Sequence, residues 1–374
     1  MRKKPVWGFS PNWVLARKLK SERNDLLSES DQSVGAERIY DAETGDLANF
    51  KARLATITYL LDRYGVLLLV VGMATVSFFL EPEVFLTWRN VSNIFRQISF
   101  NAILALGVFL VILTAGIDLS VGSILALAMM TAAVLARDGY PWPLIILAPI
   151  ITGGLVGAVN GLGLTWLRLP HPFIMTLGTL NIARGLTNLI SGGVPISGLP
   201  EPVRWLGAGN LRLANLDFPV SFAVVLICYI LVSLFLTYTR TGRHIYAIGG
   251  NPQAARVSGI NVDRTLVFVY TVCGMFAGLS GLLLAGRTNS GFPNAGVGQE
   301  LDAISAVIIG GASFFGGRGT VLGVFAGALV IGLMRNILNL RNVPVFWQQV
   351  LIGVVIIVVV ALDVLRRRGS STLR

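Results

Sequence analysis

Residues 301–329 read LDAISAVIIGGASFFGGRGTVLGVFAGAL, two apolar runs separated by a glycine-rich interruption. Five glycines lie in or beside this interruption: Gly310, Gly311, Gly316, Gly317 and Gly319. Long apolar runs are typical of membrane helices, and a break within them is tolerated only where protein or a cavity covers the exposed backbone. The stretch therefore predicts an all-α membrane protein with broken or re-entrant helices. Close packing of helices through small residues is a compatible interpretation of the same glycines.

The composition of the whole chain supports this class. Of its 374 residues, 54% are hydrophobic and only 13% are charged, and the mean hydropathy is +0.71. Because a helical crossing needs about 20 apolar residues, we expect ten crossings in a polytopic bundle. They cover Tyr64 to Leu80, Ile98 to Ala115, Leu119 to Ala136, Pro143 to Leu167, Phe173 to Ile190, Phe218 to Thr237, Thr265 to Gly286, Leu301 to Phe315, Gly319 to Leu338 and Val345 to Val364.

Arginine counts orient these crossings. With the N-terminus inside, the cytosolic segments after residue 63 hold ten arginines and three acids, so 10 − 3 = +7. The outside segments hold seven arginines and seven acids, so 7 − 7 = 0, when Arg184 and Arg335 are left out because they fall within crossings. Positive charge collects on the cytosolic side of membrane proteins. The asymmetry predicts that both termini lie inside.

Three regions follow from the distribution of charge. Residues 1–63 carry eleven Lys or Arg and nine Asp or Glu, which predicts a partly disordered cytosolic arm. The stretch FKARLATITYLLDRYG at residues 50–65 predicts an interfacial helix at the end of that arm. Residues 64–365 form the transmembrane domain, and residues 366–374 form a short basic cytosolic tail.

The positions of the lysines exclude one kind of chemistry. All five lie at or before Lys51, so no GxxxxGK[ST] loop for ATP phosphates exists in the membrane domain. Any ATP-driven work therefore needs a partner. The basic residues behind the net charge of +11 are spread between apolar runs and do not form a stripe. We therefore expect the chain to lie in a lipid bilayer and not to bind nucleic acid.

Residues 250–260, GNPQAARVSGI, predict a short capped helix between two crossings. Asn251 is a favoured N-cap, Pro252 suits the first helical position, and Gly259 suits the left-handed residue after the last turn. The small apolar side chains of Ala254, Ala255 and Val257 could sit in a groove of a partner. An ordinary capped turn in a loop is the open alternative.

Two further stretches place polar groups within the apolar chain. In TAGIDLSVGSILAL, residues 114–127, we expect Asp118 or Ser120 to cap the next helix, with an ion relay as the alternative. In RLPHPFIMTLGTLNIARGLTNLISGG, residues 168–193, the spacing of Asn181, Arg184 and Asn188 places all three on one helical face. That face either lines a polar pathway or makes contacts between packed helices.

Three motifs together make the chain recognisable: AGIDLSVGS, GRHIYAIGGNPQAARVSGI and ISAVIIGGASFFGGRGTVLG. In this order and separation they resemble the inner-membrane permease subunits of bacterial ABC importers for ribose, xylose, arabinose and similar simple sugars. The resemblance runs from about residue 64 to 368. The 63-residue arm departs from it, since members of the family typically begin near the first crossing.

The resemblance implies a homodimer of permeases in the bacterial inner membrane, working by alternating access. Its partners would be a cytosolic ATPase subunit, which uses ATP and Mg²⁺, and a periplasmic or extracellular sugar-binding protein. This chain itself would bind no cofactor or metal and would not be an enzyme.

The same resemblance suggests roles for named residues. Contact with the ATPase would involve Gly242, Gly249, Gly250, Asn251, Pro252, Ala254, Ala255, Arg256 and Gly259. Candidates for the translocation pathway are Asn160, Thr176, Thr179 and Asn181. Gating or helix capping would involve Gly116, Asp118, Ser120, Gly316, Gly317 and Arg318.

Alternatives remain at the level of function. A related permease for nucleosides, polyols or another small polar solute would carry the same motifs. An ion-coupled secondary transporter would need carboxylates embedded in the membrane, whereas all ten acids after residue 63 fall at or near the ends of the expected crossings. A membrane enzyme is disfavoured because His171 and His244 lie in different loops and no carboxylate cluster accompanies them.

Overall fold

The computed structural model describes residues 64–213 and 216–371 together with Lys20. The predicted arm, including most of its interfacial helix, therefore lies outside the described residues. The chain divides into two units, Met1–Arg63 and Tyr64–Arg374, and the description below concerns the second.

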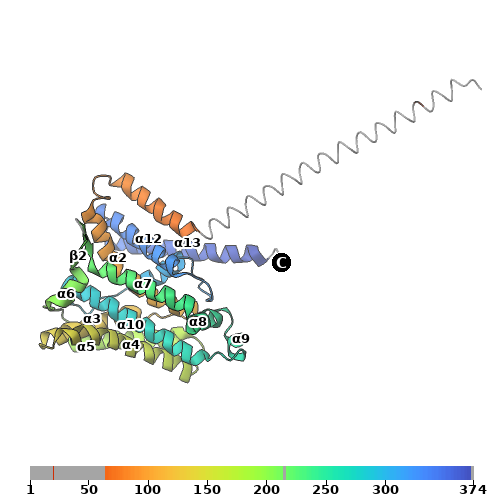
Figure 1. Cartoon of the computed structure of the whole chain (residues 1–374), viewed down its shortest axis with the longest axis horizontal. Coiled ribbons are helices and arrows are strands. Elements are labelled where there is room, and N and C mark those ends of the chain that lie inside the picture. The colour runs from red at the N-terminus through yellow and green to blue at the C-terminus, as the bar shows by residue number, and fades with distance from the viewer. Residues whose placement is uncertain (1–19, 21–63, 214–215, 372–374) are drawn as a thin grey trace, which may run out of the picture. The chain divides into compact units, whose positions relative to one another are not determined.

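α-Helices form nearly all of this second unit (Figure 1). They are a first helix over Tyr64–Leu80, then α2 (Trp88–Leu113), α3 (Val121–Arg137), α4 (Trp142–Trp166), α5 (Pro172–Ser191), α6 (Glu201–Ala208), α7 (Val220–Tyr238), α8 (Arg240–Gly250), α9 (Pro252–Val257), α10 (Val262–Thr288), α11 (Gln299–Ile309), α12 (Val321–Leu340) and α13 (Val345–Ser371). Two small antiparallel ribbons pair β1 (Ile196–Ser197) with β4 (Ser290–Gly291) and β2 (Asn210–Leu213) with β3 (Leu216–Pro219).

Among the described residues, five helices are long and apolar enough to cross a membrane: α2, α4, α7, α10 and α12. Shorter apolar helices cover Tyr64–Leu80, Val121–Arg137 and Val345–Val355. The expected helical, polytopic architecture is therefore confirmed at this level.

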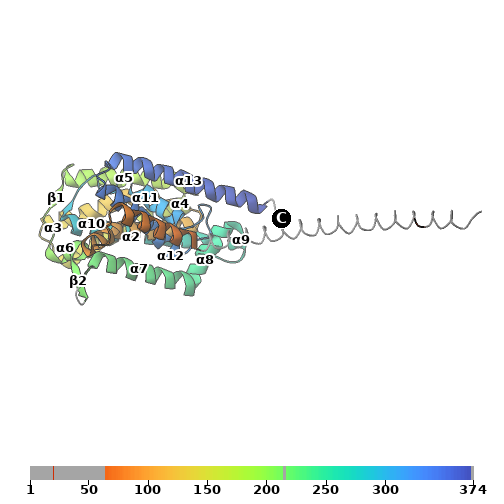
Figure 2. The same ribbon diagram turned by 90° about the horizontal axis from the view of Figure 1, so that it is seen from above.

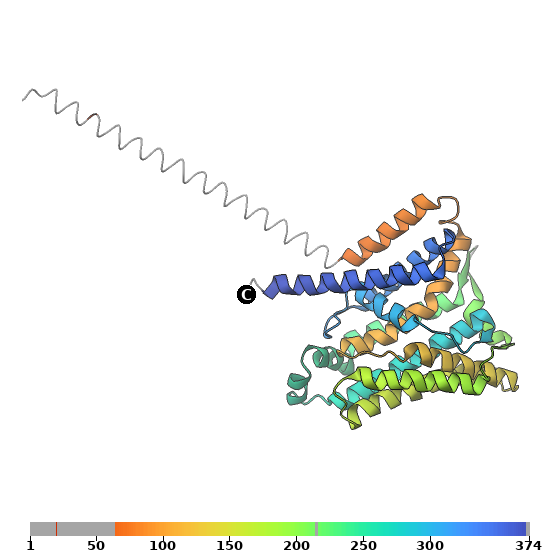
Figure 3. The ribbon, with the colours of Figure 1, turned by 180° about the vertical axis from the view of Figure 1, so that it is seen from behind.

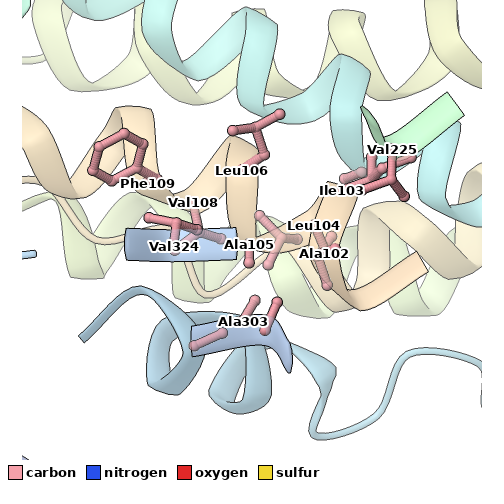
Figure 4. Packing of buried hydrophobic residues seen from close by; sticks show 14 of the residues in the cluster. Ala102, Ile103, Leu104, Ala105, Leu106, Val108, Phe109, Val225, Ala303 and Val324 are labelled. Atoms are coloured by element: carbon pink, nitrogen blue, oxygen red, sulfur yellow. The ribbon is translucent and has the colours of Figure 1, made fainter. Parts of the chain in front are cut away.

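Helix α2 occupies the centre of the bundle. All of its residues from Asn101 to Leu113 are buried, and Figure 2 shows the helix lying among α7, α10, α11 and α12. The close view in Figure 4 shows Leu104 and Phe109 of α2 together with Val225 of α7, Ala303 of α11 and Val324 of α12. The second half of α2 is apolar on every face and enclosed by other helices, which makes it a core element.

Glycines allow α4 and α10 to pack at backbone distance. Gly153, Gly157 and Gly161 repeat every four residues on α4, so they share one face. A side-chain carbon at Gly153 would collide with the backbone of Gly274, and one at Gly278 would collide with the Pro149 carbonyl. This is the small-residue contact by which membrane helices approach closely.

One predicted crossing is wrong as a continuous helix. The apolar run Leu301 to Phe315 forms a helix only through Ile309, since Gly310 ends α11 and Gly311 adopts a φ of 82°. The 11 residues of α11 rise only about 16 Å, which is half of the hydrocarbon thickness. Hydropathy identified the apolar run and could not show where its helix stops.

Other boundaries also differ from the sequence-based expectation. Helix α2 begins at Trp88, ten residues before the expected Ile98. Its first turns contain polar residues such as Asn90 and Ser92, which hydropathy excludes from a crossing although they are buried inside the protein. The last helix continues past the expected end at Val364 to Ser371. The sequence also gave no indication of α6, α8 or the two ribbons.

The two ends of the bundle carry different elements. Figures 1 and 3 show α8 and α9 at one end, where α13 also terminates and the Tyr64–Leu80 helix begins. Figure 2 places α6, β1 and β2 at the opposite end.

Candidate functional site

The linked helices α8 and α9 are held by caps that the sequence encodes. Thr239 caps α8 by accepting a hydrogen bond at Oγ1 from the Gly242 N–H at 3.0 Å. Asn251 separates the two helices, and its Oδ1 accepts from the N–H groups of Gln253 and Ala254, both at 3.0 Å. Gly259 follows α9 with a φ of 82°. The predicted N-cap at Asn251 and the predicted left-handed glycine are confirmed.

Helix α9 presents most of its side chains to solvent. Val257 is 91% exposed, and Ala254 and Arg256 are exposed as well. Ala255 is instead 4% exposed and packs with Ile248 and Val262. This corrects the expectation that both alanines face a partner, because α9 needs one apolar side chain to attach it to α8 and α10.

Arg256 also has a partner within the chain. Its Nη2 lies 2.5 Å from the Asp263 carboxylate at the start of α10, and both side chains are about half exposed. The pair fixes the side chain of Arg256. Because it lies at the surface, it contributes only about 0–1 kcal/mol to the stability of the fold.

The first chain break, residues 114–120, joins α2 to α3. Ala115 adopts a φ of 61°, and Gly116 lies against Tyr270 and Val111. The Oδ1 of Asp118 accepts from the N–H and the hydroxyl of Ser120, at 2.9 and 2.5 Å. Ser120 occupies the N-cap position of α3, but its side chain makes no capping bond. The expected side-chain cap is therefore wrong, because both polar groups bond to each other.

Asn160 of α4 joins this polar group. Its Nδ2 donates to Ser120 Oγ at 2.8 Å. The side chains of Asn160 and Cys273 also lie within hydrogen-bonding reach of the Asp118 carboxylate. Asp118, Ser120 and Asn160 therefore form one buried polar cluster that connects the first break to α4.

The second chain break, residues 310–320, joins α11 to α12 and lies against the first. Gly311, Gly316, Gly317 and Gly319 all have positive φ, a conformation that glycine adopts without steric cost. Gly316 packs on Ala115, and the Gly317 N–H donates to the Leu113 carbonyl at 2.9 Å. Arg318 is exposed at its edge.

Helix α8 contacts both breaks at once. Gly249 lies directly against the Leu113 carbonyl and the Gly317 N–H, so that a side chain there would collide with both. The hydroxyl of Tyr246 donates to the Gly319 carbonyl at 3.0 Å. Burial raises the pKa of Tyr246 above its ordinary value, so this hydroxyl keeps its proton. Gly249 of the predicted coupling residues thus lies directly against Gly317 of the predicted gating residues.

A cavity of about 570 Å³ lies between α9 and the first break. Its wall includes Gly116, Arg168, Arg256, Asp263 and Tyr270. Tyr246 and Tyr270 were not among the sequence-based candidates. Their partners lie more than 70 residues away in the chain, so no local pattern identifies them.

The four pathway candidates do not form one surface. Asn160 of α4 bonds to Ser120 of the first break, and Thr176 and Thr179 are buried on α5 with hydroxyls that donate to carbonyls of their own helix. Asn181 is exposed on α5. No group of three His, Cys, Asp or Glu residues suited to a metal occurs among residues 64–213 and 216–371.

Comparison with known proteins gives close relatives. A family model described as a branched-chain amino acid transport system permease component matches residues 90–360. The chain is 40% identical to the D-allose transport system permease protein of Escherichia coli, over 81% of this chain and 91% of that protein. It is 39% identical to the ribose import permease protein of the same organism, over 83% and 96%.

A third relative is the galactose/methyl galactoside import permease protein of Haemophilus influenzae, 37% identical over 81% of this chain and 93% of that protein. No solved structure matches the chain. Since both the family model and these relatives cover most of the chain, it is a multi-pass membrane protein and belongs to the family of permease components of bacterial ABC importers.

Proposed function

We propose that this permease carries a monosaccharide across the bacterial inner membrane by alternating access, while a separate subunit hydrolyses ATP. The relatives at 37–40% identity are permeases named for allose, ribose and galactose, which supports a sugar over the amino acid in the family description.

The proposed topology has ten crossings with both termini inside. The eighth crossing is made of two parts. After α10 the chain first returns along α3, where Gly291 lies beside Ala133 and Gly296 lies beside Gly122. Helix α11 then completes the crossing. Such broken crossings are common at transport sites. The exposed arginines near α8 and α9 support this orientation; they are Arg168, Arg240, Arg243, Arg256, Arg264 and Arg318.

The ATPase is proposed to dock on α9 and the end of α8. Both helices lie at the end of the bundle that the arginine count places in the cytosol. The exposed side chains of Ala254, Arg256 and Val257 provide the docking surface, whereas Ala255 holds α9 to the bundle.

One observation carries the coupling mechanism: Gly249 of α8 touches Leu113, the last residue of α2 before the first break, and Gly317 in the second break. A displacement of α8 by the ATPase therefore acts directly on Leu113 and Gly317, and through them on the starts of α3 and α12. Packed contacts such as those of Gly249 can switch between two arrangements, so that a small shift of α8 changes the permease from one conformation to the other.

Two further partners complete the proposal. A second copy of the chain forms the permease dimer, and the sugar-binding protein approaches the opposite end, where α6 and the two ribbons lie. Crosslinking of two differently tagged copies in the membrane tests the homodimer.

The test of the function uses the complete complex. The permease, its ATPase and its binding protein are reconstituted in vesicles, and the ATPase rate is measured with a panel of monosaccharides, nucleosides and polyols. We expect stimulation by one monosaccharide and ATP-dependent uptake that persists with an ionophore. Uptake by this chain alone, without ATPase or ATP, contradicts the proposal.

Val257→Glu tests the docking surface. A charge on a 91% exposed side chain leaves the fold intact, but it places a carboxylate in an interface and should reduce the co-purified ATPase by at least tenfold. The matched control is Val194→Glu, since Val194 is 58% exposed beyond α5 at the opposite end. Wild-type yield of ATPase with Val257→Glu refutes docking at α9.

A further inference from the structure

The segment between α10 and α11, residues 289–298, re-enters the bundle alongside α3. At its outer end Gly291 lies against Ala133, and at its inner end Gly296 lies against Gly122. Eleven residues of α3 separate these two contacts, which corresponds to about 16 Å along the helix. The segment is mostly non-helical, so its carbonyl groups need hydrogen-bond donors from elsewhere.

Arg184 of α5 supplies two of these donors. Its Nη1 lies 2.7 Å from the carbonyl oxygen of Pro293 and 2.7 Å from that of Ala295. Pro293 and Ala295 are buried, whereas Arg184 is half-buried. Hydrogen bonds from a charged donor are about twice as strong as neutral ones. Glu300, in the first turn of α11, adds an opposite charge that attracts the same guanidinium.

The other polar side chains of α5 bond within their own helix. Thr187 donates to the Ala183 carbonyl, and Asn188 donates to the Arg184 carbonyl. The same holds for Thr176, Thr179, Asn181 and Ser191. Among the hydrogen bonds of the described residues, Arg184 is therefore the one side chain that bonds α5 to another element.

The rest of the α5 interface is a row of small buried residues: Thr176, Thr179, Ala183, Thr187 and Ser191. Helix α5 packs on α3, and among the described residues the side chains of this face donate their hydrogen bonds to carbonyls of α5 itself, not to α3. The opposite face is exposed, with Ile182 at 64% and Leu189 at 78%. The charged contact at Arg184 is thus the feature that selects one position of α5.

We propose that Arg184 is a positioning residue for transport: it latches α5 to residues 289–298 in the present state, and the latch opens during the transport cycle. Release leaves the Pro293 and Ala295 carbonyls without their donor, while Glu300 offers the guanidinium a second acceptor nearby. Two alternative acceptors for the Arg184 guanidinium give α5 two discrete positions. This inference rests on the proposed alternating-access function.

The experiment measures the distance between α5 and the segment in the complete reconstituted complex. Cys228 and Cys273 are replaced by alanine, and spin labels are attached to Asn181→Cys and Val297→Cys. Both labelled positions are exposed, Val297 at 65%. With Arg184 in place, we expect a narrow distance distribution without ATP and a clear shift when the ATPase is trapped with nucleotide.

The variant Arg184→Gln removes the charge and keeps a polar side chain. It should broaden the distribution without ATP and raise the sugar-independent ATPase rate by roughly tenfold, the scale expected from losing one charge-assisted contact. Arg184→Lys retains the charge and should give intermediate values. The matched control is Arg89→Gln, which changes an exposed arginine at the start of α2 and should alter neither readout.

Two results overturn the latch. One is a distance that stays the same with and without trapped nucleotide in the complex that carries Arg184, and this comparison needs no change at position 184. The other is an assembled Arg184→Gln complex with an unaltered distribution and an unaltered basal rate. A chain that binds no ATPase at all instead refutes the proposed function, so the two failures are distinguishable.

Discussion

At the scale of single residues, the ion pair between Asp302 and Arg335 lies almost entirely inside the protein. Asp302 is 4% and Arg335 is 20% exposed. Asp302 stands in the first turn of α11, where the helix dipole also favours a negative charge. A buried pair is costly to break because the remaining charge has no water to replace its partner.

We expect Asp302→Ala to reduce the free energy of unfolding by about 3–5 kcal/mol. The measurement is a thermal unfolding curve of the purified permease in detergent. The control is Asp217→Ala, because the Arg212–Asp217 pair spans 4.0 Å with side chains that are 92% and 60% exposed. Equal melting temperatures for the two variants contradict the importance of the buried pair.

Neighbouring alanines of α9 provide a second residue-scale prediction. Ala255→Trp forces a large ring between Ile248 and Val262 and should lower the melting temperature, since overpacking costs about 1–3 kcal/mol. Ala254→Trp places the same ring on the exposed face and should leave the melting temperature unchanged while weakening binding of the ATPase. Both effects are read from one thermal melt and one co-purification, and exchanged outcomes refute the assignment of faces.

The sequence predicted one of these local features and not the other. The cap at Asn251 depends on residues within three positions of it, so the local pattern was sufficient. The inward direction of Ala255 depends on α8 and α10, which the eleven-residue motif does not contain.

At the scale of elements, hydropathy predicted where the apolar segments lie but not how they are divided. The positive φ of Gly311 and the cap at Gly310 stop α11 early, although the apolar run continues to Phe315. The contact of α8 with both breaks also required the fold, since Gly249 meets Leu113 and Gly317 from distant parts of the sequence. The glycines in the sequence indicated where the breaks lie, but the sequence did not indicate which residues contact them.

Two helical glycines test this contact. Gly249→Ala should reduce sugar-stimulated ATPase activity several-fold, because the added carbon collides with the Leu113 carbonyl and the Gly317 N–H. Gly72→Ala in the Tyr64–Leu80 helix is the control, since no atom lies within 4 Å of the carbon it adds. Alanine at that position should be neutral or slightly stabilising, by about 0.5–1 kcal/mol. Equal activities of the two variants refute transmission through Gly249.

At the scale of the whole molecule, the proposed orientation predicts opposite accessibility of the two ends. In a background without Cys228 and Cys273, Val257→Cys should react with a membrane-impermeant maleimide only in inside-out vesicles, and Val194→Cys only in intact cells stripped of their outer membrane. Both valines are exposed. The same pattern for both cysteines contradicts the proposed topology.

The enclosure of α2 has a consequence for biogenesis. Val324 of α12 packs against α2 (Figure 4), yet α12 begins at Val321 and α2 ends at Leu113, so 321 − 113 − 1 = 207 residues lie between them. At typical synthesis rates this interval lasts roughly 10–40 s. During that time α2 has already left the ribosome, but α12 is not yet there to cover its polar residues, including Asn90 and Asn101. A nascent chain arrested before α12 should therefore be a preferred substrate of membrane proteases.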